Sequence, residues 1–133
     1  MLRAISSQTY RDFLPEVHFA LEIRDIAMDA ATPIPLSHGS FALCIDMIRA
    51  KLVVESGKIY AIRRWREIDG QRHEEIQIRR AQVFSDRVEL TAESRRPDLF
   101  GPVVILGTLS SNPADATHAF GLVYGCTGFC YDS

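Results

Sequence analysis

The apolar residues of this chain are confined to short segments, and turn-forming residues separate each segment from the next. Six prolines and eight glycines are spread along the chain instead of forming clusters, and both residue types interrupt regular secondary structure. In the segment 17–24, Val17, Phe19 and Leu21 fall on alternate positions, the pattern of a half-buried strand. Further strands are expected at residues 41–45, 58–65, 75–80, 87–90, 102–107 and 120–125.

Seven or so short strands with hardly a helix predict a mostly-β fold. The dipeptide Asp69-Gly70 is a hairpin signal, and the proline-containing stretch 30–40 is expected to be a loop. Residues 1–15 are expected to be irregular, with a short helical turn around 8–14. Because 133 residues are too few for two hydrophobic cores, we expect one domain over residues 1–133, with its core at about 17–128.

The charge balance of the chain argues against binding to a nucleic-acid backbone. The chain carries 17 acidic and 15 basic residues, a net charge of −2, whereas proteins that bind the nucleic-acid backbone normally have a basic excess. The segment 63–75 mixes Trp65 with arginines, but four carboxylates in it cancel most of that charge. It is interpreted as a solvated hairpin with cross-strand ion pairs. The chain has only two lysines, Lys51 and Lys58, so an enzyme that needed a lysine base would have only these two.

The cysteine and histidine content predicts no metal, no cofactor and no disulfide framework. The three cysteines Cys44, Cys126 and Cys130 are too few for a disulfide framework or a four-ligand zinc site, and they are expected to be structural thiols. The four histidines lack the spacing of metal ligands. No apolar stretch has the length of a signal peptide or a membrane span, so we expect a cytoplasmic protein. The histidines are His18, His38, His73 and His118.

Motifs along residues 17–128 resemble, in order and spacing, the C-terminal peptidase domain of LexA, UmuD and the self-cleaving phage repressors. Residues 28–33, Met-Asp-Ala-Ala-Thr-Pro, resemble the family's nucleophile turn Gly-Asp-Ser-Met-x-Pro. Residues 76–94 contain Ile-Gln-Ile-Arg-Arg-Ala and Val-Glu-Leu, which are similar to the family's Val-Lys-Arg-Ile and Val-Glu-Leu strings. Weaker matches lie at 39–43, 57–62, 102–104 and 121–125. The resemblance implies a LexA-type fold with folded-over sheets.

The resemblance also implies a catalytic pair that this chain lacks. These peptidases cleave with a serine hydroxyl that a neutral lysine activates. The nucleophile position holds Ala30, which has no atom able to attack a carbonyl. The base position holds Arg79, whose guanidinium stays protonated. Neither Ser37 nor Ser40, which flank His38, is expected to replace the nucleophile, since such polar residues are usual in surface loops.

The predicted function is therefore that of a catalytically inactive LexA-like or phage-repressor-like domain, a dimerisation or interaction module in SOS-type or prophage-type transcriptional regulation. The expected partner is a second copy of the chain, with another regulator as the alternative. Neither direct nucleic-acid binding nor membrane contact is expected, and no DNA-binding domain is expected in this chain. Two alternatives stay open: an active self-cleaving serine peptidase whose nucleophile was mutated, and an unrelated small β-barrel binding module. The candidate interface residues are Leu122, Tyr124 and Phe129.

Overall fold

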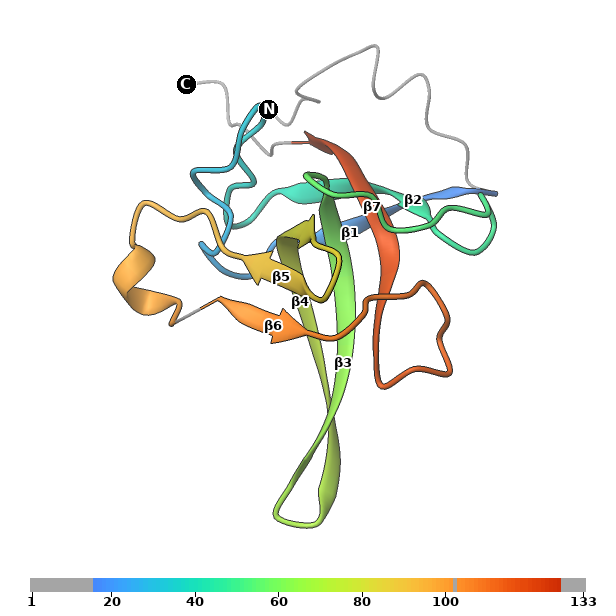
Figure 1. Cartoon of the computed structure of the whole chain (residues 1–133). Helices are drawn as coiled ribbons and strands as arrows, with labels where there is room; N and C mark the ends of the chain where they lie inside the picture. The colour runs from blue at the N-terminus through green and yellow to red at the C-terminus, as the bar shows by residue number, and fades with distance from the viewer. Residues whose placement is uncertain (1–15, 102, 128–133) are drawn as a thin grey trace, which may run out of the picture.

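The fold is mostly β, as predicted. The computed structural model describes residues 16–101 and 103–127, so the expected turn at 8–14, Cys130 and Phe129 lie outside the described residues. Neighbouring strands are antiparallel and form one sheet in the order β1-β2-β7-β3-β4-β5-β6 (Figure 1). The elements are β1 His18–Glu22, β2 Phe41–Asp46, β3 Ile59–Ile68, β4 Gln71–Val83, β5 Val88–Thr91, the 3₁₀ turn η1 Pro97–Leu99, β6 Val104–Leu106 and β7 Thr117–Thr127.

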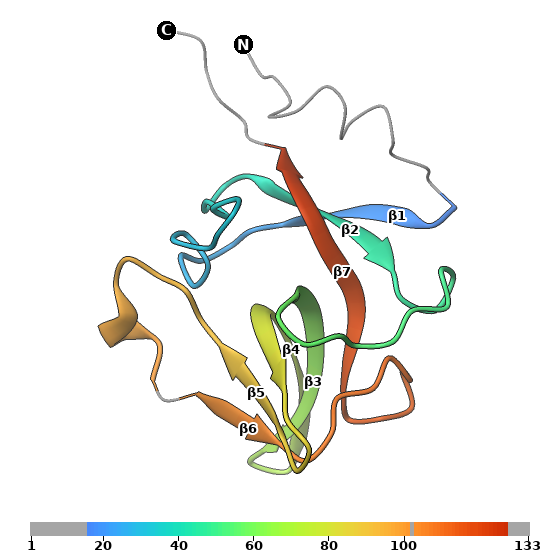
Figure 2. The same ribbon diagram turned by 45° about the horizontal axis from the view of Figure 1, so that its top comes forward.

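The sheet is strongly bent. In Figures 1 and 2, β1 and β2 run across one end of the molecule, whereas β7 and the β3–β4 hairpin run nearly perpendicular to them. A register shift between Leu43 and Cys44 lies where β2 pairs with β7, and another between Ala61 and Ile62 lies where β3 pairs with β7. Such bulges increase the local twist of a sheet, so the bend is concentrated along β7. No helix in the described part of the chain is long and apolar enough to cross a membrane.

Strand β3 is covered on both faces, which explains its continuous apolar start. Ile59 and Ala61 belong to one buried cluster, and Tyr60 and Ile62 belong to a second. Successive side chains of a strand point to opposite faces of the sheet, so the two clusters lie on opposite faces of β3. We call the first the loop-side core, because the segment 23–36 contributes to it. That segment supplies Ile23, Ala27, Met28, Ala31 and Leu36.

The C-terminal strand is an interior strand, not an exposed one. β7 pairs with β2 along residues 121–127 and with β3 along residues 117–122. The two edges of the sheet are β1 and β6. A C-terminal strand with a wholly unpaired edge, which would invite a partner, is therefore not what the structure shows, because each edge of β7 is paired within the chain over part of its length.

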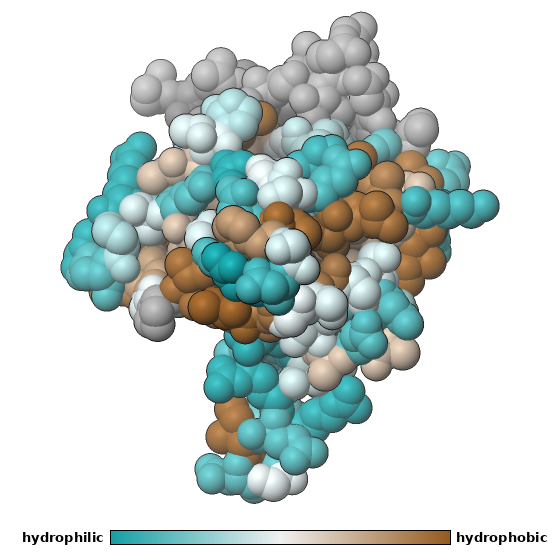
Figure 3. Space-filling view, in the orientation of Figure 1, coloured by the Kyte–Doolittle hydropathy of each residue, from teal (hydrophilic) through white to brown (hydrophobic). Residues whose placement is uncertain are grey.

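The β3–β4 hairpin projects beyond the rest of the sheet (Figure 1). Asp69 and Gly70 both have positive φ, 53° and 77°, which is the geometry of a tight hairpin turn, and pairing continues up to that turn. Cross-strand ion pairs join Arg63 to Glu74 at 3.2 Å and Arg66 to Glu75 at 3.3 Å. The visible face of this hairpin is largely hydrophilic in Figure 3. The prediction of a solvated hairpin with cross-strand ion pairs is confirmed.

The packing of Gly121 in β7 yields a test of the fold. A Cβ at this position would lie 2.6 Å from Cζ of Phe19 and 3.1 Å from Cβ of Cys44. We predict that Gly121→Ala lowers the free energy of unfolding by about 1–3 kcal/mol, because the Phe19 ring must move. Urea unfolding measures the change. Gly107→Ala is the matched control, because no atom lies within 4 Å of the Cβ built there.

A double-mutant cycle assigns that loss to its cause. With Phe19→Leu the crowding atom is gone, so adding Gly121→Ala should cost less in this background than in the unaltered protein. Equal costs in the two backgrounds, or equal costs at Gly121 and Gly107, would contradict the packing around β7.

Candidate functional site

The segment 25–36, which contains the turn matched to the family's nucleophile, is held by its own backbone and by buried side chains. The Ala27 N–H donates to the carboxylate of Asp25 at 2.9 Å. The N–H groups of Ala31 and Leu36 both donate to the Met28 carbonyl, at 3.1 and 3.0 Å. Met28 and Leu36 are almost completely buried. The loop predicted at residues 30–40 contains no strand or helix, as expected, but its residues Ala31 and Leu36 belong to the loop-side core.

A second segment, residues 93–95, runs along this turn. The Glu93 N–H donates to the Ala27 carbonyl and the Ala30 N–H donates to the Glu93 carbonyl, both at 2.8 Å. The Arg95 N–H donates to the Asp29 carboxylate at 2.8 Å. Ala30 itself has an exposed side chain. The turn is therefore held against segment 93–95 through the backbone of Ala27 and Ala30 and the side chain of Asp29.

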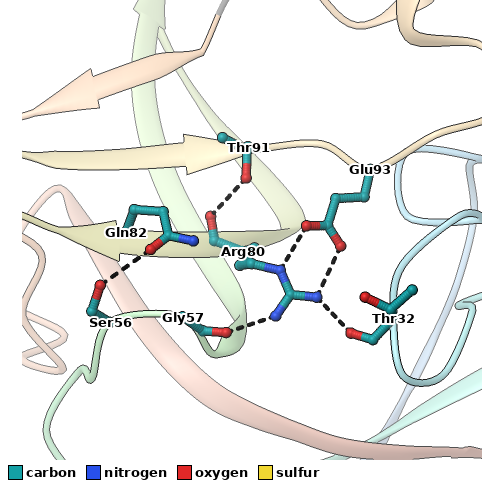
Figure 4. Close-up of polar contacts among 7 residues, drawn as sticks. All are labelled: Thr32, Ser56, Gly57, Arg80, Gln82, Thr91 and Glu93. Atoms are coloured by element: carbon teal, nitrogen blue, oxygen red, sulfur yellow. Dashed lines mark hydrogen bonds and ion pairs between the residues drawn. The ribbon is translucent and has the colours of Figure 1, made fainter.

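Arg80 joins these two segments to the sheet (Figure 4). Its guanidinium binds both carboxylate oxygens of Glu93, at 2.6 and 2.9 Å, and donates to the carbonyls of Gly57 and Thr32 at 2.6 Å each. The pair is largely shielded, since the side chains of Arg80 and Glu93 are 16% and 28% exposed. The hydrogen bonds that Arg80 donates to the Glu93 carboxylate raise the pKa of Arg80 further above its ordinary value, so this group stays a cation.

Arg79 has very different surroundings. Its guanidinium donates to the carbonyl of the adjacent Ile78 at 2.8 Å and lies 5.8 Å from the centre of the Phe100 ring. Burial lowers the pKa of Arg79, while the negative charges of Asp25 and Glu75 act in the opposite direction. No carboxylate of the described residues forms an ion pair with it.

The two positions matched to the catalytic pair are not joined by a direct interaction. Within the described ranges, no hydrogen bond, ion pair or ring contact links Ala30 to Arg79. The arginine that reaches the turn is Arg80, through the Thr32 carbonyl. Neighbouring residues of a strand point to opposite faces, so Arg79 and Arg80 serve different surroundings. Both are arginines. Whichever of the two is aligned with the family's lysine, its side chain does not accept a proton near neutral pH.

Sequence reasoning missed Arg80 and Glu93, although a signal was present. Arg80 shares its strand face with Ile76 and Ile78, two positions apart at each step. A charged residue that continues an apolar face is expected to have a buried partner. Glu93 follows β5 at the level of Arg80, whose strand partner is Thr91. The alternation therefore pointed to a paired cation at Arg80.

The other residues considered as a nucleophile or base either form hydrogen bonds with other groups or are exposed. The buried Ser40 hydroxyl donates to the Ser37 carbonyl at 2.5 Å and lies 3.3 Å from the sulfur of Cys126. His38 and Lys51 are exposed. A hydrogen bond to Glu55 raises the pKa of Lys58, which is the opposite of what a catalytic base requires.

The cysteines and histidines form no metal-binding group in the described part of the chain. No three His, Cys, Asp or Glu residues there come together in a way that could hold an ion. Burial raises the pKa of the Cys44 thiol to about 12, which is the behaviour of a structural thiol. His118 is buried in β7, and its Nδ1 lies 3.0 Å from the Asp115 carbonyl.

Two of the candidate interface residues, Leu122 and Tyr124, lie on a half-buried part of β7. Leu122 packs against the second core and is the strand partner of Ile45. The Tyr124 ring lies 5.2 Å from the ring of His18, which is itself the strand partner of Ile45. These four residues, His18, Ile45, Leu122 and Tyr124, are neighbours, and together they are called the β7 face below.

No protein-family model matches the chain, and neither does any curated protein sequence. The likeness to the LexA-type peptidase domains therefore rests on the sequence motifs alone.

The Arg80–Glu93 pair yields a prediction about stability. Arg80→Leu leaves the Glu93 carboxylate and two carbonyls without their donor, so we expect the free energy of unfolding to fall by about 2–4 kcal/mol. Arg80→Lys should recover only part of this, because an ammonium cannot reproduce the planar fork. Urea unfolding measures both, and amide hydrogen exchange at Ala30 reports whether the turn opens.

Arg96→Leu is the matched control for that measurement. Arg96 also pairs with a carboxylate, that of Asp98, but both side chains are more than half exposed, at 61% and 62%. Exposed pairs contribute about 0–1 kcal/mol. If Arg80→Leu costs no more than Arg96→Leu, Arg80 does not hold the turn.

Proposed function

We propose that this chain is a non-catalytic relative of the LexA-type peptidase domains, and that it acts by pairing with a second copy of itself. The observation that carries the non-catalytic part is the pair of arginines in β4. Whichever of Arg79 and Arg80 corresponds to the family's lysine, the side chain cannot take a proton from a nucleophile. Ala30, at the matched nucleophile position, offers none to deprotonate.

Two features of the fold are consistent with the family assignment. The segment matched to the nucleophile turn lies next to the end of β4, since Arg80 binds the Thr32 carbonyl. The bent single sheet of seven antiparallel strands is compatible with the folded-over sheets that the resemblance implies (Figure 2). A cytoplasmic setting and a role in SOS-type or prophage-type transcriptional regulation belong to the same proposal.

The β7 face is the surface proposed for self-association. β7 lies between β2 and β3 and each of its edges is paired within the chain over part of its length, so the proposed contact uses side chains that project from the sheet. Tyr124 and Leu122 are half-buried apolar residues on neighbouring positions of that face. A two-fold arrangement would use the same patch on both copies, and tyrosine is frequent at the centre of such contacts.

The self-association is testable by sedimentation. We predict that the protein forms dimers over a micromolar concentration series and that Tyr124→Arg raises the dissociation constant at least about tenfold, because a charge would be desolvated in the contact. Val53→Arg is the matched control, since Val53 is exposed and belongs to no strand, and so is not part of the β7 face. A monomer at every concentration, or equal effects of the two substitutions, would contradict the proposal.

The non-catalytic assignment is tested with a peptide that contains the family's Ala-Gly cleavage sequence. We predict no cleavage by the unaltered protein and none by Ala30→Ser, because the new serine lacks a base. The double variants Ala30→Ser with Arg79→Lys and Ala30→Ser with Arg80→Lys place a lysine at each register. Slow cleavage is expected only with the lysine at position 79, the register that the motif comparison implies.

Circular dichroism must show each of these variants to be folded before its activity is compared. Cleavage by the unaltered protein or by Ala30→Ser alone would show that the chain has a base elsewhere, and the non-catalytic assignment would be wrong. Cleavage only with the lysine at position 80 would instead move the register by one residue.

A further inference from the structure

A pocket of about 290 Å³ lies between strands β4, β5 and β6 and the segment that follows η1. Most of the described residues that line it are apolar, and Arg79 is the only charged side chain among them. The apolar walls come from Leu90, Ala92, Phe100, Val103 and Val104. Apolar pockets with one well-placed charged group are typical of sites for small amphipathic ligands.

The guanidinium of Arg79 has unused hydrogen-bonding capacity. An arginine carries five N–H donors, and in the described part of the chain Arg79 uses its side chain for one hydrogen bond, to the Ile78 carbonyl. The adjacent Arg80 shows what a satisfied arginine looks like here, with a bidentate carboxylate and two carbonyls. Keeping a half-buried cation without a counter-charge is costly, so an anion in the pocket would lower the free energy of this group.

The carboxylates nearest to Arg79 do not fill this role. Asp25 and Glu75 influence its pKa through their charge, but neither forms an ion pair with it. The Asp25 carboxylate accepts the Ala27 N–H, and Glu75 pairs across the hairpin with Arg66. Among the described residues, therefore, no carboxylate binds the Arg79 guanidinium.

The surface around the pocket is apolar. Leu99, Val103 and Ile105 are large exposed hydrophobic side chains of η1, β6 and the connection between them. Figure 3 shows hydrophobic residues gathered over β6 and the residues before it. A ligand that enters here can bury an apolar group against Val103, which lines the pocket, while its charged end meets Arg79.

We propose that the Arg79 pocket binds a carboxylate attached to an apolar group. The guanidinium binds the carboxylate, and Phe100, Leu90 and Val104 contact the apolar part. A free aliphatic acid and the C-terminus of a peptide that ends in an aliphatic residue present the same chemistry. The proposal does not depend on the family assignment, because it follows from the surroundings of Arg79 alone.

The first test uses octanoate on the unaltered protein, with octanol as the uncharged control, followed by NMR titration of the amides of Leu90 and Ala92. Octanoate should bind about 10- to 100-fold more tightly than octanol, the factor expected for charge-assisted hydrogen bonds. Equal affinities, or no binding of octanoate up to its solubility limit together with none of the peptide below, overturn the proposal.

The peptide acetyl-Ala-Leu-Val, prepared with a free carboxylate and as the carboxamide, separates the two sources of ligand. Tighter binding of the free peptide than of octanoate identifies a peptide C-terminus as the ligand, and the reverse order identifies an aliphatic acid. In either case the carboxamide should bind at least about tenfold more weakly than the carboxylate. Equal binding of the two peptide forms counts against the proposal.

Substitutions then locate the site. Arg79→Gln should weaken octanoate binding about 10- to 100-fold, and Arg79→Lys should weaken it less, because the charge remains. Arg96→Gln removes the same charge from an exposed position outside the pocket and should leave binding unchanged. If Arg79→Gln unfolds the protein, the octanoate and octanol comparison on the unaltered chain still decides. Loss of affinity in Arg96→Gln equal to that in Arg79→Gln would show a non-specific charge effect and overturn the site.

Discussion

The structure depends on the interaction between Arg80 and Glu93. The segment 25–36 belongs to no strand or helix, yet it buries Met28 and Leu36 in the loop-side core. It is held there by backbone hydrogen bonds to Glu93 and by the Arg80 guanidinium, which also reaches the Gly57 carbonyl before β3. Because a guanidinium offers planar donors in fixed directions, one side chain binds three segments that are far apart in the sequence.

This arrangement stabilises the turn and cannot perform general base catalysis. A base must exist partly in its neutral form at the working pH, whereas a carboxylate partner raises the pKa of Arg80. The same contacts that hold the turn thus keep the group charged. Ala30 has no nucleophilic atom and Arg80 is permanently charged, so neither residue can take part in a nucleophile-and-base pair at this turn.

The adjacent residues Arg79 and Arg80 form different interactions because successive side chains of a strand point to opposite faces. Arg80 points to the side of β4 that meets segment 93–95 and the turn, where a carboxylate and two carbonyls accept its hydrogen bonds. Arg79 lines a mainly apolar pocket and contacts Phe100. One cation is therefore part of the scaffold, and the other is available to an external anion.

The amino-acid sequence by itself determined the local structure. Alternating apolar residues and turn dipeptides placed all seven strands near their observed positions, and Asp69-Gly70 placed the hairpin, because these signals act between residues that are close in the chain. The interior position of β7, the burial of segment 23–36 and the choice of Arg80 over Arg79 as the residue bound to the turn were decided only by the tertiary structure. Each depends on residues distant in sequence, such as Arg80 and Thr32, and periodicity within one segment carries no information about which distant segment covers it.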